Sequence, residues 1–205
     1  MHVDDMVAIA PSKKELDTLE TPIETHGELV KQGIPKKLLG MELTWEQEKR
    51  VIKLTQKTAI ESLTREFGIV PTEIPSKSLP LNPEMFKEPV SKGDLAPLEK
   101  SQSLLESLLY TARQTRPEIS IHVNLLGHRT SKASHNNMQP ALQVLRYLMS
   151  TETNGLTIPK SGEGTMDEPM NIQGFADASY RGEPSKSQSG SLILLYNNLI
   201  TWSSR

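Results

Sequence analysis

Prolines between residues 71 and 97 divide this sequence more sharply than any other feature. Six of the 14 prolines in the 205-residue chain fall in this stretch, namely Pro71, Pro75, Pro80, Pro83, Pro89 and Pro97. Proline lacks an amide hydrogen and its ring fixes φ, so this density excludes a helix or a central strand. The sequence therefore predicts an extended linker over 71–100, which is also the main domain boundary.

Before the linker, the pattern predicts mixed α and β structure. Val3 to Ala10 is apolar apart from Asp4 and Asp5, as expected of a buried strand that carries two carboxylates. Ser12 and Glu15 form a capping-box pair, which predicts a helix ending near Gly27. Pro22 falls inside that helix and is expected to kink or shorten it.

The rest of the N-terminal part predicts a hairpin and a helix. Residues 36–44 and 51–55 have the composition of two strands, with a charged turn over residues 46–49 between them. An amphipathic helix follows, with Ala59, Ile60, Leu63 and Phe67 on one face and Gly68 as its stop.

After the linker, helices come first and strands last. Residues 101–155 carry leucine-rich stripes at helical spacing, and Pro117 suits the first turn of the second of three helices. A polar loop over 160–170 leads to three short strands at 171–178, 191–196 and 199–203.

Composition and charge limit the function classes. The chain has no cysteine, which excludes disulfides, thiolate zinc sites and cysteine nucleophiles. Its formal net charge is −2, so binding to nucleic acid requires a local basic patch. No apolar run reaches the length of a membrane span, and the N-terminus has no signal-peptide pattern. These features predict an intracellular protein, cytoplasmic or nuclear, with no membrane partner.

Asp4 and Asp5 are the first candidate site. Two adjacent carboxylates at a strand turn suit Mg²⁺, which prefers oxygen ligands. Phosphoryl-transfer enzymes hold two such ions about 4 Å apart, one at the attacking and one at the leaving oxygen. The run His2-Val3-Asp4-Asp5-Met6 also resembles the (Tyr/Phe)-Val-Asp-Asp-Met segment of the reverse transcriptases of copia-type retrotransposons.

Further segments resemble the same family in the same order. They are Leu39-Gly40-Met41-Glu42-Leu43, Leu54-Thr55-Gln56-Lys57, Thr115-Arg116-Pro117-Glu118-Ile119, Val144-Leu145-Arg146-Tyr147-Leu148, Gly155-Leu156, Phe175-Ala176-Asp177-Ala178-Ser179, Ser187 to Leu192 and Thr201-Trp202-Ser203-Ser204. The ordered series covers nearly the whole chain. Departures from the family pattern are His2, Pro22, Asn137-Met138 and Ser179.

The resemblance implies an α+β fold in two loosely joined parts. Residues 1–70 would be the end of a reverse-transcriptase palm and the start of its thumb, and 71–100 the linker. Residues 101–158 would be a helical connection, and 159–205 an incomplete RNase H-like antiparallel sheet. The implied parent activities are RNA-directed DNA polymerase and RNase H, acting on an RNA/DNA template-primer with Mg²⁺. Asp4, Asp5 and Asp177 would be the catalytic positions, with Asp4 and Asp5 as the metal ligands.

The resemblance also implies that these sites are incomplete. The family's polymerase site has three carboxylates, and the first of them lies upstream of the Asp-Asp pair. The family's RNase H site needs a cluster of acidic residues, of which only Asp177 has a match here. We therefore expect a truncated, decayed copy of the family that is inactive alone and binds Mg²⁺ weakly or not at all. We also expect its apolar faces and strand edges to be exposed and its stability to be low.

Two other functions are compatible with the sequence. In the first, further sequence completes an active polymerase. In the second, the helical region is a nucleic-acid-binding or interaction module. Its Arg113 and Arg116, with Arg129 and Lys132, would contact the phosphate backbone of the nucleic acid. His122, His128 and His135 lack metal-ligand spacing and are interpreted as surface or packing residues. The oligomeric state does not follow from the sequence.

Overall fold

A computed structural model describes residues 7–8, 10, 12–26, 30, 33–46, 48–70, 79, 98–130, 138–159, 170–180 and 187–205. These residues form five α-helices and two antiparallel sheets, a mixed α+β architecture. Among them, no helix is both long and apolar enough to cross a bilayer.

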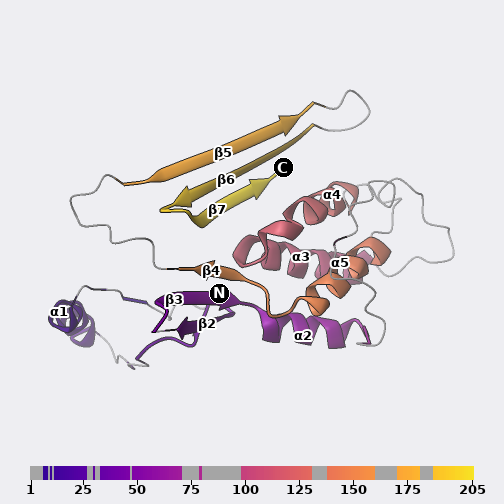
Figure 1. Cartoon of the computed structure of the whole chain (residues 1–205). Coiled ribbons are helices and arrows are strands. Elements are labelled where there is room, and N and C mark those ends of the chain that lie inside the picture. Colours follow the sequence, from indigo (N-terminus) through magenta and orange to yellow (C-terminus); the bar gives the residue numbers. More distant parts are fainter. Residues whose placement is uncertain are drawn as a thin grey trace.

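The first helix, α1 (Lys13–Glu24), begins where the capping pair predicts. The Ser12 hydroxyl accepts the amide of Glu15 at 3.4 Å and donates to its carboxylate at 2.9 Å. The helix ends two residues after Pro22 and before Gly27, in agreement with the predicted shortening by this proline. It has no buried residue, and Figure 1 shows it apart from the other helices.

The predicted strand over Val3 to Ala10 is wrong for the residues that the structure describes. Val7, Ala8 and Ala10 have no strand conformation, and Val7 is 42% exposed. The remaining positions, Asp4 and Asp5 among them, lie outside the described residues.

The first sheet has the order β1-β2-β3-β4, with every neighbouring pair antiparallel. The strand predicted over 36–44 is two strands, β1 (Lys37–Leu38) and β2 (Met41–Glu46). They are separate because Leu39 and Gly40 have φ of 48° and 76°, which no strand accommodates. The strand β3 (Val51–Thr55) is confirmed as predicted.

The fourth strand of this sheet, β4 (Leu156–Ile158), comes from the far side of the linker. It pairs with β3 in a register that places Leu54 opposite Leu156. Gly155 lies just before β4, and a Cβ at this position would be 2.0 Å from the carbonyl oxygen of Leu54. Only glycine permits this approach of the two main chains.

The helices agree with the sequence pattern. They are α2 (Lys57–Glu66), α3 (Leu98–Gln114), α4 (Ser120–Thr130) and α5 (Met138–Ser150), with a 3₁₀ turn η3 (Pro117–Ile119) before α4. Pro117 begins η3, and Gly68 follows α2 with φ of 66°, as a helix stop requires.

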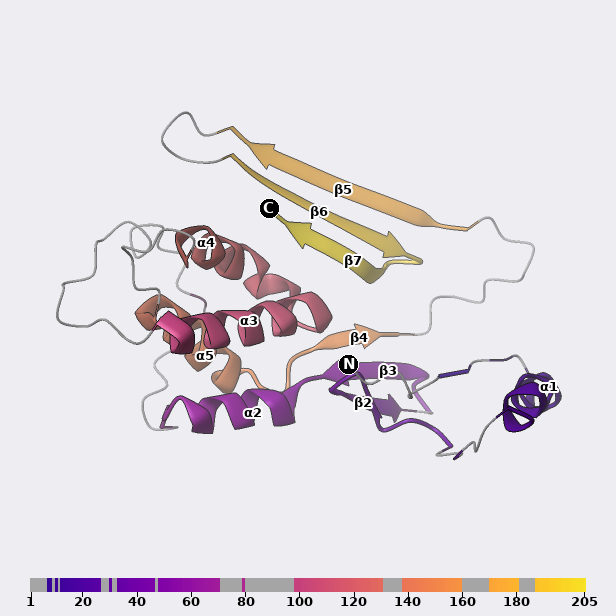
Figure 2. The ribbon, with the colours of Figure 1, turned by 180° about the vertical axis from the view of Figure 1, so that it is seen from behind.

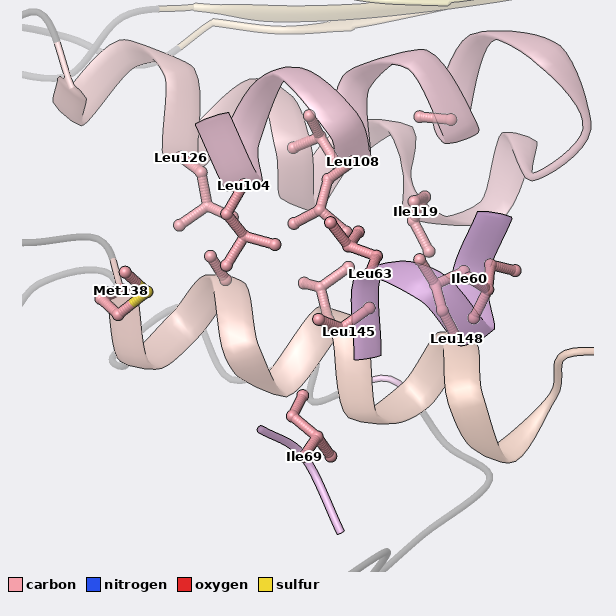
Figure 3. Packing of buried hydrophobic residues seen from close by; sticks show 14 residues of the cluster. Ile60, Leu63, Ile69, Leu104, Leu108, Ile119, Leu126, Met138, Leu145 and Leu148 are labelled. Atoms are coloured by element: carbon pink, nitrogen blue, oxygen red, sulfur yellow. The ribbon is translucent and has the colours of Figure 1, made fainter. Parts of the chain in front are cut away.

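One hydrophobic core joins the two sides of the linker. Figure 3 shows residues of α2 packed among those of α3, α4 and α5. The fully buried side chains include Ile60 of α2, Leu104 and Leu108 of α3, and Leu145 and Leu148 of α5. The sequence predicts two loosely joined parts, whereas α2 and β3 are held to the segments after the linker by this core and by β4.

The second sheet has the order β5-β6-β7. Its strands are β5 (Ile172–Ser179), β6 (Gln188–Leu195) and β7 (Asn198–Ser204), which confirms the three predicted strands. Tyr196 and Asn197 both have positive φ, as in the two-residue turns that match the twist of a hairpin. Figures 1 and 2 show β7 nearest the helices and β5 at the outer edge.

Candidate functional site

Asp177 is the one predicted catalytic residue that the structure describes. It lies on β5 opposite Gly190 of β6, and it is exposed. Its Oδ1 accepts the amide of Ala178 at 2.9 Å. Asp4 and Asp5 lie outside the described residues, so the structure does not place them relative to Asp177.

A shallow hollow of about 460 Å³ surrounds Asp177. It is lined by Ala176, Asp177, Ala178, Ser189, Gly190, Ser191, Ser203 and Arg205. Among the residues that the structure describes, Asp177 is the only acidic side chain in this lining, and Arg205 is its only basic one.

These donors do not fit a pair of Mg²⁺ ions. A two-metal site needs several carboxylates that share the charge of the two ions, and serine hydroxyls are weak substitutes. Among the described residues, no three His, Cys, Asp or Glu side chains gather where they could hold a metal ion. The described residues around Asp177 therefore provide no site for a two-metal reaction.

Trp202 attaches the second sheet to the helices. Its indole Nε1 donates to the carbonyl oxygen of Ala112 on α3 at 2.9 Å. The carbonyl is near the end of α3, where main-chain acceptors lack partners within the helix. This bond fixes β7, and through β6 the strand that carries Asp177, against the helical core.

The two arginines proposed for nucleic-acid binding have different surroundings. Arg113 is exposed near the end of α3, whereas Arg116 is 1% exposed. The guanidinium of Arg116 donates to the carbonyl and hydroxyl oxygens of Thr151 at 3.0 and 2.6 Å, and to the Glu118 carboxylate at 2.6 Å. It also lies 5.5 Å from the centre of the Tyr147 ring. These contacts give Arg116 a structural role and leave it little access to a phosphate.

A buried polar pair next to Arg116 was not identified from the sequence. Gln56 precedes α2 and Thr115 follows α3, and the Thr115 hydroxyl donates to the Gln56 side-chain carbonyl at 2.7 Å. Both are at most 1% exposed. Each falls in a segment that resembles the family, but nothing in the local pattern indicates that the two side chains meet.

A second hollow, of about 380 Å³, lies beside this pair. Its lining is Lys53, Thr115, Arg116, Pro117, Glu118, Tyr147, Asn154, Gly155, Leu156 and Thr157. The charged groups in it are two cations and one carboxylate, and Glu118 already pairs with Arg116.

Two contacts of partly buried charged side chains connect distant elements: Lys57 with Glu152 across the linker, and Glu42 of β2 with the start of α2. The Glu152 carboxylate, 2.7 Å from the ammonium group of Lys57, raises the pKa of this lysine. Burial raises the pKa of the Glu42 carboxyl, but hydrogen bonds from Thr58 and Thr55 outweigh it and hold the pKa below its ordinary value of 4.5.

The histidines do not form a group that the structure describes. His122 is buried in α4, and the backbone of His128 is helical. His135 lies outside the described residues, as do Lys132 and the side chain of Arg129.

Comparison with known proteins finds distant relatives, some over the whole chain and others over half of it. A retrovirus-related Pol polyprotein from transposon TNT 1-94 of Nicotiana tabacum is 26% identical over 100% of this chain and 15% of its own length. An uncharacterized mitochondrial protein of Arabidopsis thaliana is 25% identical over 100% of this chain and 81% of its own. A secreted RxLR effector protein of Plasmopara viticola is 30% identical over 50% of this chain and 70% of its own.

Two further Pol polyproteins, from transposons of Arabidopsis thaliana, match 51% of the chain. This chain thus spans 15% of the length of the first relative. No family model matches the sequence, and no solved structure matches it.

Proposed function

Because the chain is a distant homologue of the copia-type retrotransposon Pol polyproteins, we propose that it is a segment of such a polyprotein that is catalytically inactive by itself. Residues 1–70 correspond to the end of the palm and the start of the thumb, and 71–100 to the linker. Residues 101–158 correspond to the helical connection, and 159–205 to the first strands of the RNase H domain.

In this assignment, Asp4, Asp5 and Asp177 are remnants of two catalytic sites. The parent activities are RNA-directed DNA polymerase and RNase H, with a template-primer as substrate and Mg²⁺ as cofactor. The order of the strands β5-β6-β7, with the aspartate on the first of them, supports the assignment of the C-terminal part.

The proposed inactivity rests on the residues that line the hollow around Asp177. Among the described residues, one acidic side chain and one arginine line this hollow, which is less negative charge than a Mg²⁺ pair requires. A single ion bound there would lack a second ion to stabilise the leaving oxygen of a phosphodiester.

The test is an assay of the 205-residue chain on a labelled RNA–DNA hybrid and on a primed RNA template, with Mg²⁺ or Mn²⁺. We expect neither cleavage nor extension above the level of the matched variant Asp177→Asn. Metal-dependent cleavage that this substitution abolishes would refute the proposal.

A second candidate is a segment of an active enzyme that further Pol sequence completes. It is favoured by the exposure of Asp177, which leaves its carboxylate accessible to additional metal ligands. This candidate predicts that adding the flanking Pol segments, in the same chain or a second one, restores metal-dependent cleavage of the hybrid and that Asp177→Asn removes it. Sequencing the transcript and its genomic flanks would establish whether such segments are encoded there.

A further inference from the structure

A single Asn-Gly dipeptide occurs in the sequence, and it lies directly before β4. It is Asn154-Gly155, in the connection between α5 and β4. Both residues are outside helix and strand, and Asn154 is exposed. Figures 1 and 2 show that the strand which follows lies beside β3.

Asparagine followed by glycine is chemically reactive. The amide nitrogen of the glycine attacks the side-chain carbonyl carbon of the asparagine and forms a new N–C bond, while the amide proton and the side-chain NH₂ leave together as ammonia. The product is a cyclic succinimide, which water opens at either of its carbonyl carbons. One opening gives aspartate and the other gives isoaspartate, whose main chain runs through the former side chain and is longer by a carbon atom. Glycine favours the attack because it has no side chain to hinder it.

The main chain is held on both sides of this dipeptide. On the α5 side, the amide of Asn154 donates to the carbonyl oxygen of Thr151 at 2.8 Å, and the guanidinium of Arg116 donates to the same oxygen at 3.0 Å. On the β4 side, a Cβ on Gly155 would lie 2.0 Å from the carbonyl oxygen of Leu54. The chain at Gly155 therefore cannot move toward β3 when the ring closes or when the main chain lengthens.

The strand after the dipeptide is short. β4 is three residues long, and each of them pairs with a residue of β3. A strand held by so few main-chain bonds opens at a lower free energy than a buried helical core does. A hollow of about 380 Å³, whose lining includes Asn154 and Gly155, gives water access to the carbonyl carbons of the ring.

We propose that Asn154 is a site of spontaneous deamidation, that opening of β4 from β3 controls its rate, and that the isoaspartate product keeps the strand open. While β4 is closed, the contacts at Thr151 and Leu54 hold the peptide between Asn154 and Gly155, so the ring forms when the strand opens. The rate of deamidation then follows the population of the open form.

The structural consequence follows from the position of Gly155. Isoaspartate at position 154 lengthens the main chain directly before Gly155, which displaces this glycine from its place against Leu54. The register of Leu156 opposite Leu54 depends on that place. Deamidation is therefore a one-way change that releases the link which β4 forms between the two sides of the linker.

The test incubates the 205-residue chain at mildly alkaline pH, folded or unfolded in guanidinium chloride, and follows its peptides by mass spectrometry. Deamidation raises the mass of the peptide, and electron-transfer fragmentation separates isoaspartate from aspartate. We expect modification of Asn154 in both samples, at a rate about tenfold or more lower in the folded chain. Asn171 is the internal control, because it is also exposed but the β-branched Ile172 that follows hinders the attack, so it should react far more slowly in both samples.

Hydrogen exchange of the modified chain measures the structural consequence. We expect the chain with isoaspartate to lose protection of the amides in β4 and their partners in β3, while α3 and α5 keep theirs. Asn154→Asp adds the negative charge without lengthening the main chain, so it should keep this protection. Asn154→Gln closes a larger, less favourable ring, so it should remain unmodified and protected over the same period.

Four results would overturn the proposal. They are equal rates of deamidation in the folded and the unfolded chain, no reaction of Asn154 in either, a chain with isoaspartate whose β4 stays protected, and loss of the same protection in Asn154→Asp. The last result would assign the opening of β4 to the charge and not to the longer main chain.

Discussion

At the scale of single residues, Gly155 has the least room for a side chain among the glycines that the structure describes. A methyl group there would lie 2.0 Å from the Leu54 carbonyl oxygen, so β3 and β4 would have to move apart. We expect Gly155→Ala to lower the free energy of unfolding by about 2 kcal/mol or more, in the upper part of the range for overpacking. Urea denaturation followed by circular dichroism measures this loss.

Gly127 provides the matched control for this substitution. It lies within α4, and no atom is within 4 Å of the position of its missing Cβ. Gly127→Ala should raise the free energy of unfolding by about 0.5–1 kcal/mol, because alanine favours the helix. Equal effects of the two substitutions would show that the contact between Gly155 and Leu54 does not exist.

Substitutions of Arg116 and Arg113 distinguish a structural role from a role in binding nucleic acid. Arg116→Ala removes a buried guanidinium from Glu118 and Thr151, and we expect it to cost about 3 kcal/mol or more. Arg113→Glu, at an exposed position, should change stability by less than about 0.5 kcal/mol.

These two substitutions also refine the test of nucleic-acid binding. Loss of RNA–DNA hybrid binding on Arg116→Glu could follow from unfolding alone, so Arg113→Glu is the informative variant. We expect little salt-dependent binding by the chain and no change on Arg113→Glu, measured by fluorescence anisotropy. Strong binding that falls with salt and is lost in the folded Arg113→Glu variant would support a binding module instead.

At the scale of the element, Glu42 of β2 caps the helix α2. The residue before this helix, Gln56, makes no side-chain capping bond, while the Glu42 carboxylate accepts the Thr58 amide at 3.0 Å. Because the pKa of Glu42 is lowered in the folded protein, its contribution is present above pH 4.5 and is lost as the pH falls through the folded value.

We therefore expect Glu42→Gln to lower the free energy of unfolding by about 1 kcal/mol at pH 7, as loss of a cap does. The difference from the unmodified chain should shrink as the pH falls below 4.5, which urea denaturation at pH 7 and pH 3.5 would detect. Glu106→Gln, on the exposed side of α3, serves as control. A difference that is constant with pH would contradict the assignment of the cap to the carboxylate.

Elements with a strong local pattern could be predicted from the sequence. The helical spacing of leucines predicted α3 and α5, and Gly68 predicted the end of α2. Contacts between distant segments could not be predicted, because no local pattern encodes them. The pairing of β4 with β3 and the bond between Thr115 and Gln56 both join the two sides of the linker. The break between β1 and β2 was missed because Leu39 adopts a positive φ that leucine rarely shows.

At the scale of the whole molecule, stability should differ between the helical core and the second sheet. The core contains many fully buried side chains from α2 to α5, whereas Asn198 is the only buried residue among the described strands β5, β6 and β7. We expect amide hydrogens of β5 and β6 to exchange through local opening, at a lower free energy than those of α3 and α5.

Ile60→Ala tests whether α2 belongs to the same cooperative unit as the helices beyond the linker. Ile60 is 1% exposed, so its truncation should cost about 2–4 kcal/mol. Hydrogen exchange should then show reduced protection in α3 and α5 and unchanged protection in β5 and β6. Reduced protection confined to α2 would mean that the linker separates two independent units.

The candidate site could be predicted only in part. The sequence located Asp177 on a strand, but its neighbours in space, Arg205 among them, depend on the pairing of three strands. The assignment of Asp4 and Asp5 stays a prediction, because both lie outside the described residues.

The central claim, that this Pol-related chain holds no working metal pair at Asp177, is tested most directly by a Mn²⁺ titration of the whole chain followed by NMR line broadening. We predict weak binding of one ion at most near β5, with a dissociation constant on the order of 1 mM or higher, and its loss in Asp177→Asn. Two ions bound near Asp177 with micromolar affinity would contradict the account.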